Sequence, residues 1–275
     1  MITPPMRPSA PSRARITDYL LGSTHNLGID RAVIDVLLQC LPARHRPAVL
    51  AGLRRHARAM RMFLARATHA CITEHRLTQV IDLGTMIPAT PGTHALARAL
   101  DPTTRVAYVV DNSHDMAVAH RLLAGTDHIV VASSGFKPLA TWSLLTGDGG
   151  LDPQRPVVLL AVDVLDQLRT AEQVRDVLAD WRTCLPVGSV LVISHLTDDR
   201  LPAADAATAA GMRTVYRDRV RKTLTARSHE EVTGLLAAAG IRLSTPLVMA
   251  HHWRPIDPDA PDTRSWVGIA TVGEA

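Results

Sequence analysis

Apolar positions in the first third of the chain recur every three or four residues, a spacing that predicts amphipathic helices. The pattern gives a helix ending at Gly22, a second helix that ends before Pro42, and a long helix from Pro47 to about Thr68 with arginines on its outer face. No strand pattern occurs in this part of the chain. We therefore expect residues 13–75 to form a helical cap.

The remainder of the chain alternates between short apolar runs and amphipathic stretches. The predicted strands are QVIDLG (79–84), RVAYVV (105–110), HIVVAS (128–133), PVVLLAV (156–162), GSVLVIS (188–194), IRLSTPLVM (241–249) and WVGIATV (266–272). The predicted helices are THALARAL (93–100), HDMAVAHRLLAG (114–125), AEQVRDVLADWRTCL (171–185), 212–225 and 228–239. Apolar strands separated by helices indicate a mostly parallel sheet that is covered on both faces, which is a doubly wound α/β fold. Residues 76–275 are expected to form this core, and the Pro-rich residues 1–12 are expected to be disordered.

Composition narrows the class of protein. Of the 275 residues 47% are apolar and 20% are charged, which excludes a disordered chain. The net charge of +4 comes from arginines scattered among acids, and only 3% of residues are aromatic, so a nucleic-acid partner is not expected. The three cysteines are isolated, which argues against a disulfide framework or a metal site. The chain shows neither a leading apolar run nor a stretch long enough to cross a membrane, so we expect a cytoplasmic protein.

In a doubly wound sheet, ligands bind at the carboxyl ends of the strands. The first predicted strand ends in Asp82, Leu83, Gly84 and Thr85, without the GxGxxG or GxxxxGK[ST] patterns of dinucleotide and nucleoside triphosphate sites. An acid followed by one glycine suits the amino-acid end of S-adenosylmethionine, which has no pyrophosphate to bind.

Several blocks in order along the chain carry a resemblance to a known family. They are ARITDYLLGSTHNLGIDR (14–31), VIDLGTMIPATPGTH (80–94), RVAYVVDNS (105–113), GSVLVISHLTDD (188–199) and WRP (253–255). With these blocks the chain resembles actinobacterial S-adenosylmethionine-dependent methyltransferases that have a helical N-terminal extension. The resemblance implies a class I, Rossmann-like methyltransferase sheet of seven strands with the last one antiparallel, and an N-terminal segment that folds over the cofactor.

Candidate site residues follow from the resemblance and from the strand-end loops. The cofactor-binding candidates are Tyr19, Gly22, Asp82, Gly84, Thr85, Asp111, Asn112 and Ser134. The catalytic candidates are His195, Asp166 and His25, because a base or orienting group at the sheet edge or in the N-terminal block could act on a nucleophile. We expect no metal.

The chain departs from the family pattern at three cofactor positions. Met86 stands in place of a second glycine, Val110 in place of an acid (with Asp111 one residue later), and Ser134 in place of another acid. The first hypothesis is a methyltransferase acting on a small molecule in natural-product metabolism. The altered pocket leaves two alternatives: an enzyme of the same fold with a non-methylating reaction such as cyclisation, rearrangement or elimination, or a non-catalytic binding protein. The sequence leaves open whether the chain forms a homodimer.

Overall fold

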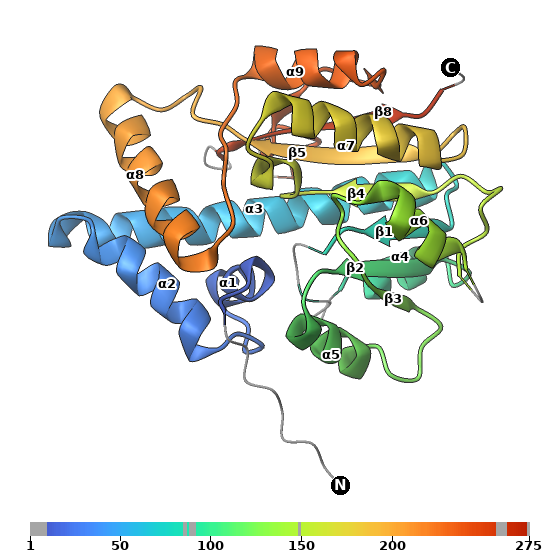
Figure 1. Cartoon of the computed structure of the whole chain (residues 1–275), viewed down its shortest axis with the longest axis horizontal. Coiled ribbons are helices and arrows are strands. Elements are labelled where there is room, and N and C mark those ends of the chain that lie inside the picture. The colour runs from blue at the N-terminus through green and yellow to red at the C-terminus, as the bar shows by residue number, and fades with distance from the viewer. Residues whose placement is uncertain (1–9, 85–86, 88–91, 148–149, 257–262, 274–275) are drawn as a thin grey trace, which may run out of the picture.

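The computed structural model describes residues 10–84, 87, 92–147, 150–256 and 263–273, in which helices surround one sheet (Figure 1). The helices are α1 (Arg13–Leu20), α2 (Gly28–Gln39), α3 (Arg46–Thr73), α4 (Thr93–Leu100), α5 (Ser113–Leu122), α6 (Pro138–Thr146), α7 (Ala171–Cys184), α8 (Ala203–Val220) and α9 (His229–Ala238), with 3₁₀ turns η1 (Ala43–His45) and η2 (Leu165–Gln167). The strands are β1 (Gln79–Asp82), β2 (Arg105–Val110), β3 (Ile129–Ala132), β4 (Val158–Ala161), β5 (Val190–Leu196), β6 (Arg242–Leu243), β7 (Val248–Met249) and β8 (Ser265–Thr271).

The sheet has the order β3-β2-β1-β4-β5-β8-β6, and β7 also pairs with β8. Strands β1 to β5 are parallel to their neighbours, and β8 runs antiparallel to β5. The predicted doubly wound, mostly parallel fold is confirmed. The described sheet has eight strands rather than seven, because 241–249 forms two short strands around Pro246, a residue with no N–H to donate to a ladder.

Alternate residues of each strand face opposite layers of helices. In β2, Val106 and Tyr108 lie in one apolar cluster, which includes residues of α3, α4 and α5. Ala107 and Val109 lie in the other cluster, with residues of α6, α7 and α9. Strands that are apolar on both faces are therefore explained by two buried layers.

The helical cap has a core of its own. It contains Ile16 of α1, Ile34 of α2, Ala57 in the first half of α3 and Tyr216 of α8. Figure 1 places α1, α2 and α8 together at one end of the sheet, although α8 follows α1 by nearly two hundred residues of sequence. The cap is thus completed by a segment that the sequence analysis placed within the core.

Three local features differ from the predicted elements. Helix α8 starts earlier than expected, after Pro202, and ends earlier because Arg221 adopts a left-handed backbone with φ 60°. Helix α6 has no amphipathic pattern, and Leu139 and Leu144 on it are exposed. Residues 1–9 of the expected disordered tail lie outside the described residues, whereas Ser12 is buried and N-caps α1. No helix in the described part of the chain is long and apolar enough to cross a membrane.

Candidate functional site

The turn after β1 is shaped by a buried carboxylate. Asp82 accepts hydrogen bonds from the Gly84 amide (3.1 Å) and the Thr93 hydroxyl (2.9 Å), and burial raises the pKa of Asp82. Gly84 has φ +72°, and a Cβ at this position would lie 1.9 Å from the carbonyl oxygen of Val109. Only glycine fits this close approach of the turn to β2.

A pocket with about 440 Å³ of empty space, part of it open to solvent, lies at the carboxyl ends of β1 to β4. The strand-end residues that line it are Leu83, Gly84, Val109, Asp111, Ser133, Ser134, Gly135, Phe136, Val164 and Gln167; Asp115 comes from α5, and Ser12, Arg13, Ala14 and Lys222 come from the cap side. This edge of a doubly wound sheet is where the fold places ligands.

The cap wall of the pocket is held by buried ion pairs. Arg15, which is 1% exposed, donates to Asp30 (2.7 Å) and to Asp115 of α5 (2.5 Å). Ser12 donates its hydroxyl to Asp115 and its amide to Asp30 (2.9 Å). The N-terminus of α1 is therefore fixed against the sheet side of the pocket as well as against α2.

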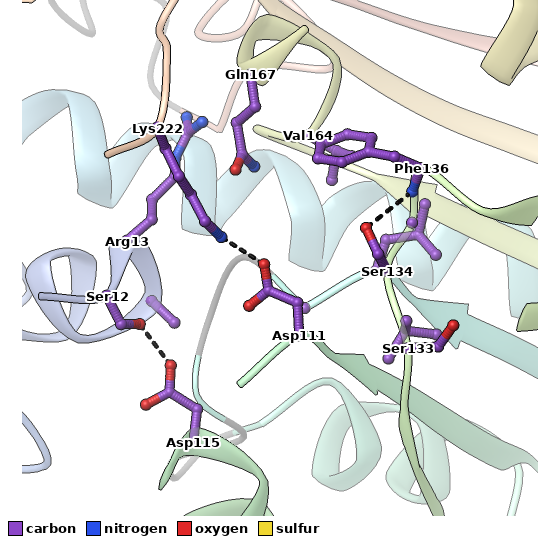
Figure 2. Close-up of a pocket in the computed structure, with 15 residues that line it drawn as sticks. Ser12, Arg13, Asp111, Asp115, Ser133, Ser134, Phe136, Val164, Gln167 and Lys222 are labelled. Atoms are coloured by element: carbon purple, nitrogen blue, oxygen red, sulfur yellow. Dashed lines mark hydrogen bonds and ion pairs between the residues drawn. The ribbon is translucent and has the colours of Figure 1, made fainter. Parts of the chain in front are cut away.

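One ion pair crosses the pocket itself. Figure 2 shows Lys222, which follows α8, reaching Asp111 at the end of β2, and the two side chains form a hydrogen-bonded ion pair. Both side chains are more than a third exposed (35% and 39%), so solvent screens the pair and other groups can compete for either partner.

A second charged cluster, formed by Arg13, Asp163 and Asp166, lies beside the pocket. Arg13 donates two hydrogen bonds to Asp166 (2.8 and 2.9 Å), and its Nη2 lies 3.8 Å from Oδ1 of Asp163. Burial opposes ionisation of Asp166, but Arg13 holds its pKa below the usual value. Burial raises the pKa of Asp163, which has no such paired partner.

His195 is enclosed at the end of β5. Arg227 donates to Nε2 (2.8 Å), so the ring proton resides on Nδ1 and faces the Leu196 carbonyl (3.0 Å). The ring is 1% exposed, and burial lowers its pKa. In this arrangement the imidazole has no free nitrogen to accept a proton.

Of the predicted site residues, the structure brings Gly84, Asp111 and Ser134 together as pocket lining. Asp82 lies beneath the turn, Asn112 N-caps α5, and Asp166 binds Arg13. The other cap candidates do not line the pocket: Tyr19 packs in the cap core, Gly22 ends α1, and His25 Nδ1 lies 3.6 Å from Asp18. Thr85 and Met86 lie outside the described residues. The functional roles of these residues remain predictions.

Sequence reasoning missed Arg13 and Lys222, which both line the pocket. Lys222 carried a signal, since the chain has only two lysines, but its distance in sequence from Asp111 hides their pairing. No group of three or more His, Cys, Asp or Glu side chains that could hold a metal ion occurs among the described residues.

Comparisons with known proteins agree with this architecture. A crystal structure from Thermobifida fusca, of a protein proposed to be a methyltransferase, is 26% identical over 100% of both chains with a TM-score of 0.81. A DUF574 family protein from Streptomyces avermitilis is 25% identical, with 95% of this chain and 97% of that chain covered and a TM-score of 0.79. Human N-acetylserotonin methyltransferase in complex with SAM shares the fold at 14% identity and a TM-score of 0.50, over 80% of this chain and 56% of that chain.

The sequence profile described as S-adenosyl methyltransferase matches residues 3–275. A search of curated proteins found no match.

Proposed function

The chain belongs to the S-adenosyl methyltransferase family, and from this premise we propose that its strand-end pocket binds S-adenosylmethionine for methyl transfer to a small molecule of specialised metabolism. The observation that carries the proposal is the pocket itself. It lies where β1 and β2 end, under a turn whose glycine leaves no room for a side chain, and it is walled by the N-terminus of α1.

The residues present fit the cofactor chemically. Asp111 offers a carboxylate to the ribose hydroxyls, and Ser134 offers a hydroxyl on the neighbouring loop. Arg13 and Lys222 offer positive charge to the carboxylate of the methionine portion. When bound, the cofactor supplies a methyl group already activated by its sulfonium, so this chain has to hold the acceptor in line and exclude water.

The cap supports a small acceptor. The N-terminus of α1 is locked by buried ion pairs, and α8 closes the same end of the sheet (Figure 1). These buried contacts favour a small acceptor, because a segment of polymer would have to displace them. The resemblance to actinobacterial proteins supports specialised metabolism as the setting.

A non-methylating reaction on the same fold is the second candidate. It is favoured by the ion pair of Lys222 with Asp111, which already satisfies the carboxylate expected to take the ribose hydroxyls. In this alternative the pocket would prefer a ligand other than the cofactor.

Calorimetric titration with S-adenosylmethionine and S-adenosylhomocysteine tests the proposal. We expect both to bind at micromolar concentrations, and Asp111→Asn to weaken binding about tenfold or more through loss of charge-assisted hydrogen bonds. Asp127→Asn is the matched control, because Asp127 is 58% exposed and pairs only with Arg98 outside the pocket lining among the described residues. Absence of binding at millimolar ligand would reject methyl transfer in favour of the second candidate.

A further inference from the structure

We propose that Asp163 is the catalytic base for a hydroxyl-bearing acceptor, an assignment that rests on the proposed methyl transfer. Asp163 follows β4 at the edge where the cofactor pocket opens. Its neighbour Val164 and nearby Gln167 line that pocket, and the Gln167 side chain donates to the Asp163 carbonyl (3.2 Å). Arg13 also lines the pocket, and its Nη2 lies 3.8 Å from Oδ1 of Asp163, so the carboxylate lies beside the pocket.

Of the two carboxylates near Arg13, Asp163 is the one that is free to react with a ligand, because Asp166 is already paired. Arg13 gives both of its donating hydrogen bonds to Asp166 and only approaches Asp163, at 3.8 Å. Ser194 donates a long hydrogen bond from its hydroxyl to Oδ1 of Asp163 (3.4 Å). The Asp163 side chain is 15% exposed, so a ligand can reach it, whereas Asp166 is 2% exposed. Burial raises the pKa of Asp163, which makes it a stronger base than an ordinary carboxylate.

An unpartnered hydroxyl faces the same cluster. Tyr216 of α8 is 6% exposed, and its hydroxyl has no hydrogen-bond partner among the residues that the structure describes. The charges that act on it belong to Arg13, Asp166, Asp163 and Asp111, and burial raises its pKa to about 12, so it remains a donor. A buried hydroxyl without a partner costs about 1–3 kcal/mol, a cost that a bound ligand removes.

His56 of α3 supplies a second donor rather than a second base. Burial lowers its pKa, which keeps the ring neutral, and Asp163 is the charge that most strongly opposes this shift. Nδ1 accepts from the Arg264 amide (3.5 Å), so the proton of the neutral ring lies on Nε2. The charges and hydrogen bonds that act on the Asp163 carboxylate come from Arg13 of α1, Asp166 of η2, His56 of α3 and Ser194 of β5, and the Asp163 charge in turn acts on Tyr216 of α8.

This set of groups selects a hydroxyl acceptor. A hydroxyl donates its proton to Asp163 and accepts from Tyr216, whereas an ammonium could not accept and would be repelled by Arg13. In the reaction the acceptor oxygen forms a bond to the methyl carbon while the carbon–sulfur bond breaks, and the electron pair of that bond stays on sulfur. The hydroxyl proton passes to the Asp163 carboxylate, so the products are an ether, a neutral thioether and a protonated acid.

The backbone conformation of Asp163 decides which substitution tests the assignment. Its φ of 57° is left-handed, and the conformation is held by its amide donating to Ser194 (2.7 Å). Asparagine tolerates this conformation as aspartate does, so Asp163→Asn removes the charge without disturbing the backbone.

The test uses 4-nitrophenol, because its phenolate absorbs visible light. The phenol is titrated into the full chain saturated with S-adenosylhomocysteine, at a pH near the pKa of the free phenol. We expect binding to wild type to lower the phenolate absorbance, because the Asp163 carboxylate opposes a second negative charge. Asp163→Asn should bind the phenol about tenfold more weakly and without this decrease. Tyr216→Phe should weaken binding but keep the decrease, since the carboxylate is still present.

Two results would overturn the assignment: Asp163→Asn with the affinity and absorbance change of wild type, or a wild-type complex that binds S-adenosylhomocysteine but no nitrophenol. Failure of wild type to bind S-adenosylhomocysteine would instead refute the proposed function. Binding of S-adenosylhomocysteine to Asp163→Asn, expected at wild-type affinity, shows that the variant is folded.

Discussion

Asp163 and Asp166 lie three residues apart, yet the same carboxylate-to-amide change should lower the free energy of unfolding only at Asp166. Asp166→Asn leaves Arg13, which is 15% exposed, with only a distant carboxylate at 3.8 Å. Breaking a buried ion pair costs 3–5 kcal/mol, and the remaining attraction to Asp163 puts the loss near the lower end, about 3 kcal/mol. In a chain of this size the melting temperature should fall by about 6 °C. Asp163→Asn removes a buried charge that is poorly paired, so it should leave stability unchanged or raise it.

The pH dependence separates the two effects. The pKa of Asp166 is lowered in the folded state, so its contribution is complete above the unfolded value of about 3.9 and is lost only as pH falls through the folded value. The pKa of Asp163 is raised, so the gain from Asp163→Asn is present at neutral pH and disappears as pH falls toward about 4.

Urea unfolding followed by circular dichroism at pH 7.5 and pH 5 measures both variants. The loss in Asp166→Asn should be the same at the two pH values, whereas any gain in Asp163→Asn should shrink at pH 5. Equal destabilisation by both substitutions at pH 7.5 would refute the inference that Arg13 pairs with Asp166 rather than with Asp163.

Three further predictions concern the pocket and the thiols. Gly84→Ala should lower the free energy of unfolding by at least about 2 kcal/mol and abolish S-adenosylhomocysteine binding, because its Cβ would lie 1.9 Å from the Val109 oxygen. Thermal melts with and without ligand measure both effects, and an unchanged melting temperature would contradict the close approach at Gly84. Lys222→Met should strengthen binding of 5′-methylthioadenosine several-fold by freeing Asp111, and weaker binding in calorimetry would show that the ion pair does not compete. Burial raises the pKa of Cys71 to about 12, so its thiol should be unreactive at pH 8. Iodoacetamide should label the exposed Cys40 in the native chain and Cys71 only in urea, and labelling of Cys71 in the native chain would contradict its burial.

Much of the fold could be predicted because the central apolar runs are buried on both faces, although β3 at the edge of the sheet is only half-buried. In β4, for example, Val158 and Leu160 enter one core cluster while Leu159 and Ala161 enter the other. These strands could therefore be predicted from their own sequences, without knowing which strands lie next to them. Helix α6 was missed because its sequence has no polar face, and Leu144 remains exposed.

The site was only partly predictable, for a different reason. Gly84 and Asp111 could be found because each lies one or two residues after the end of a strand. Arg13 and Tyr216 meet across about two hundred residues, and no local pattern specifies which cap helix packs over which strand end. Contacts between distant segments depend on tertiary packing, so the charged cluster became visible only in the structure.

The continuity of α3 limits how the cap can move relative to the sheet. Its 28 residues form a single helix about 42 Å long, whose first half packs with the cap and whose second half packs on the sheet. A bend in the middle would break buried backbone hydrogen bonds, so the cap cannot hinge away from the sheet along this helix. Ligands therefore reach the pocket without movement of the cap about α3, since part of the pocket is already open to solvent.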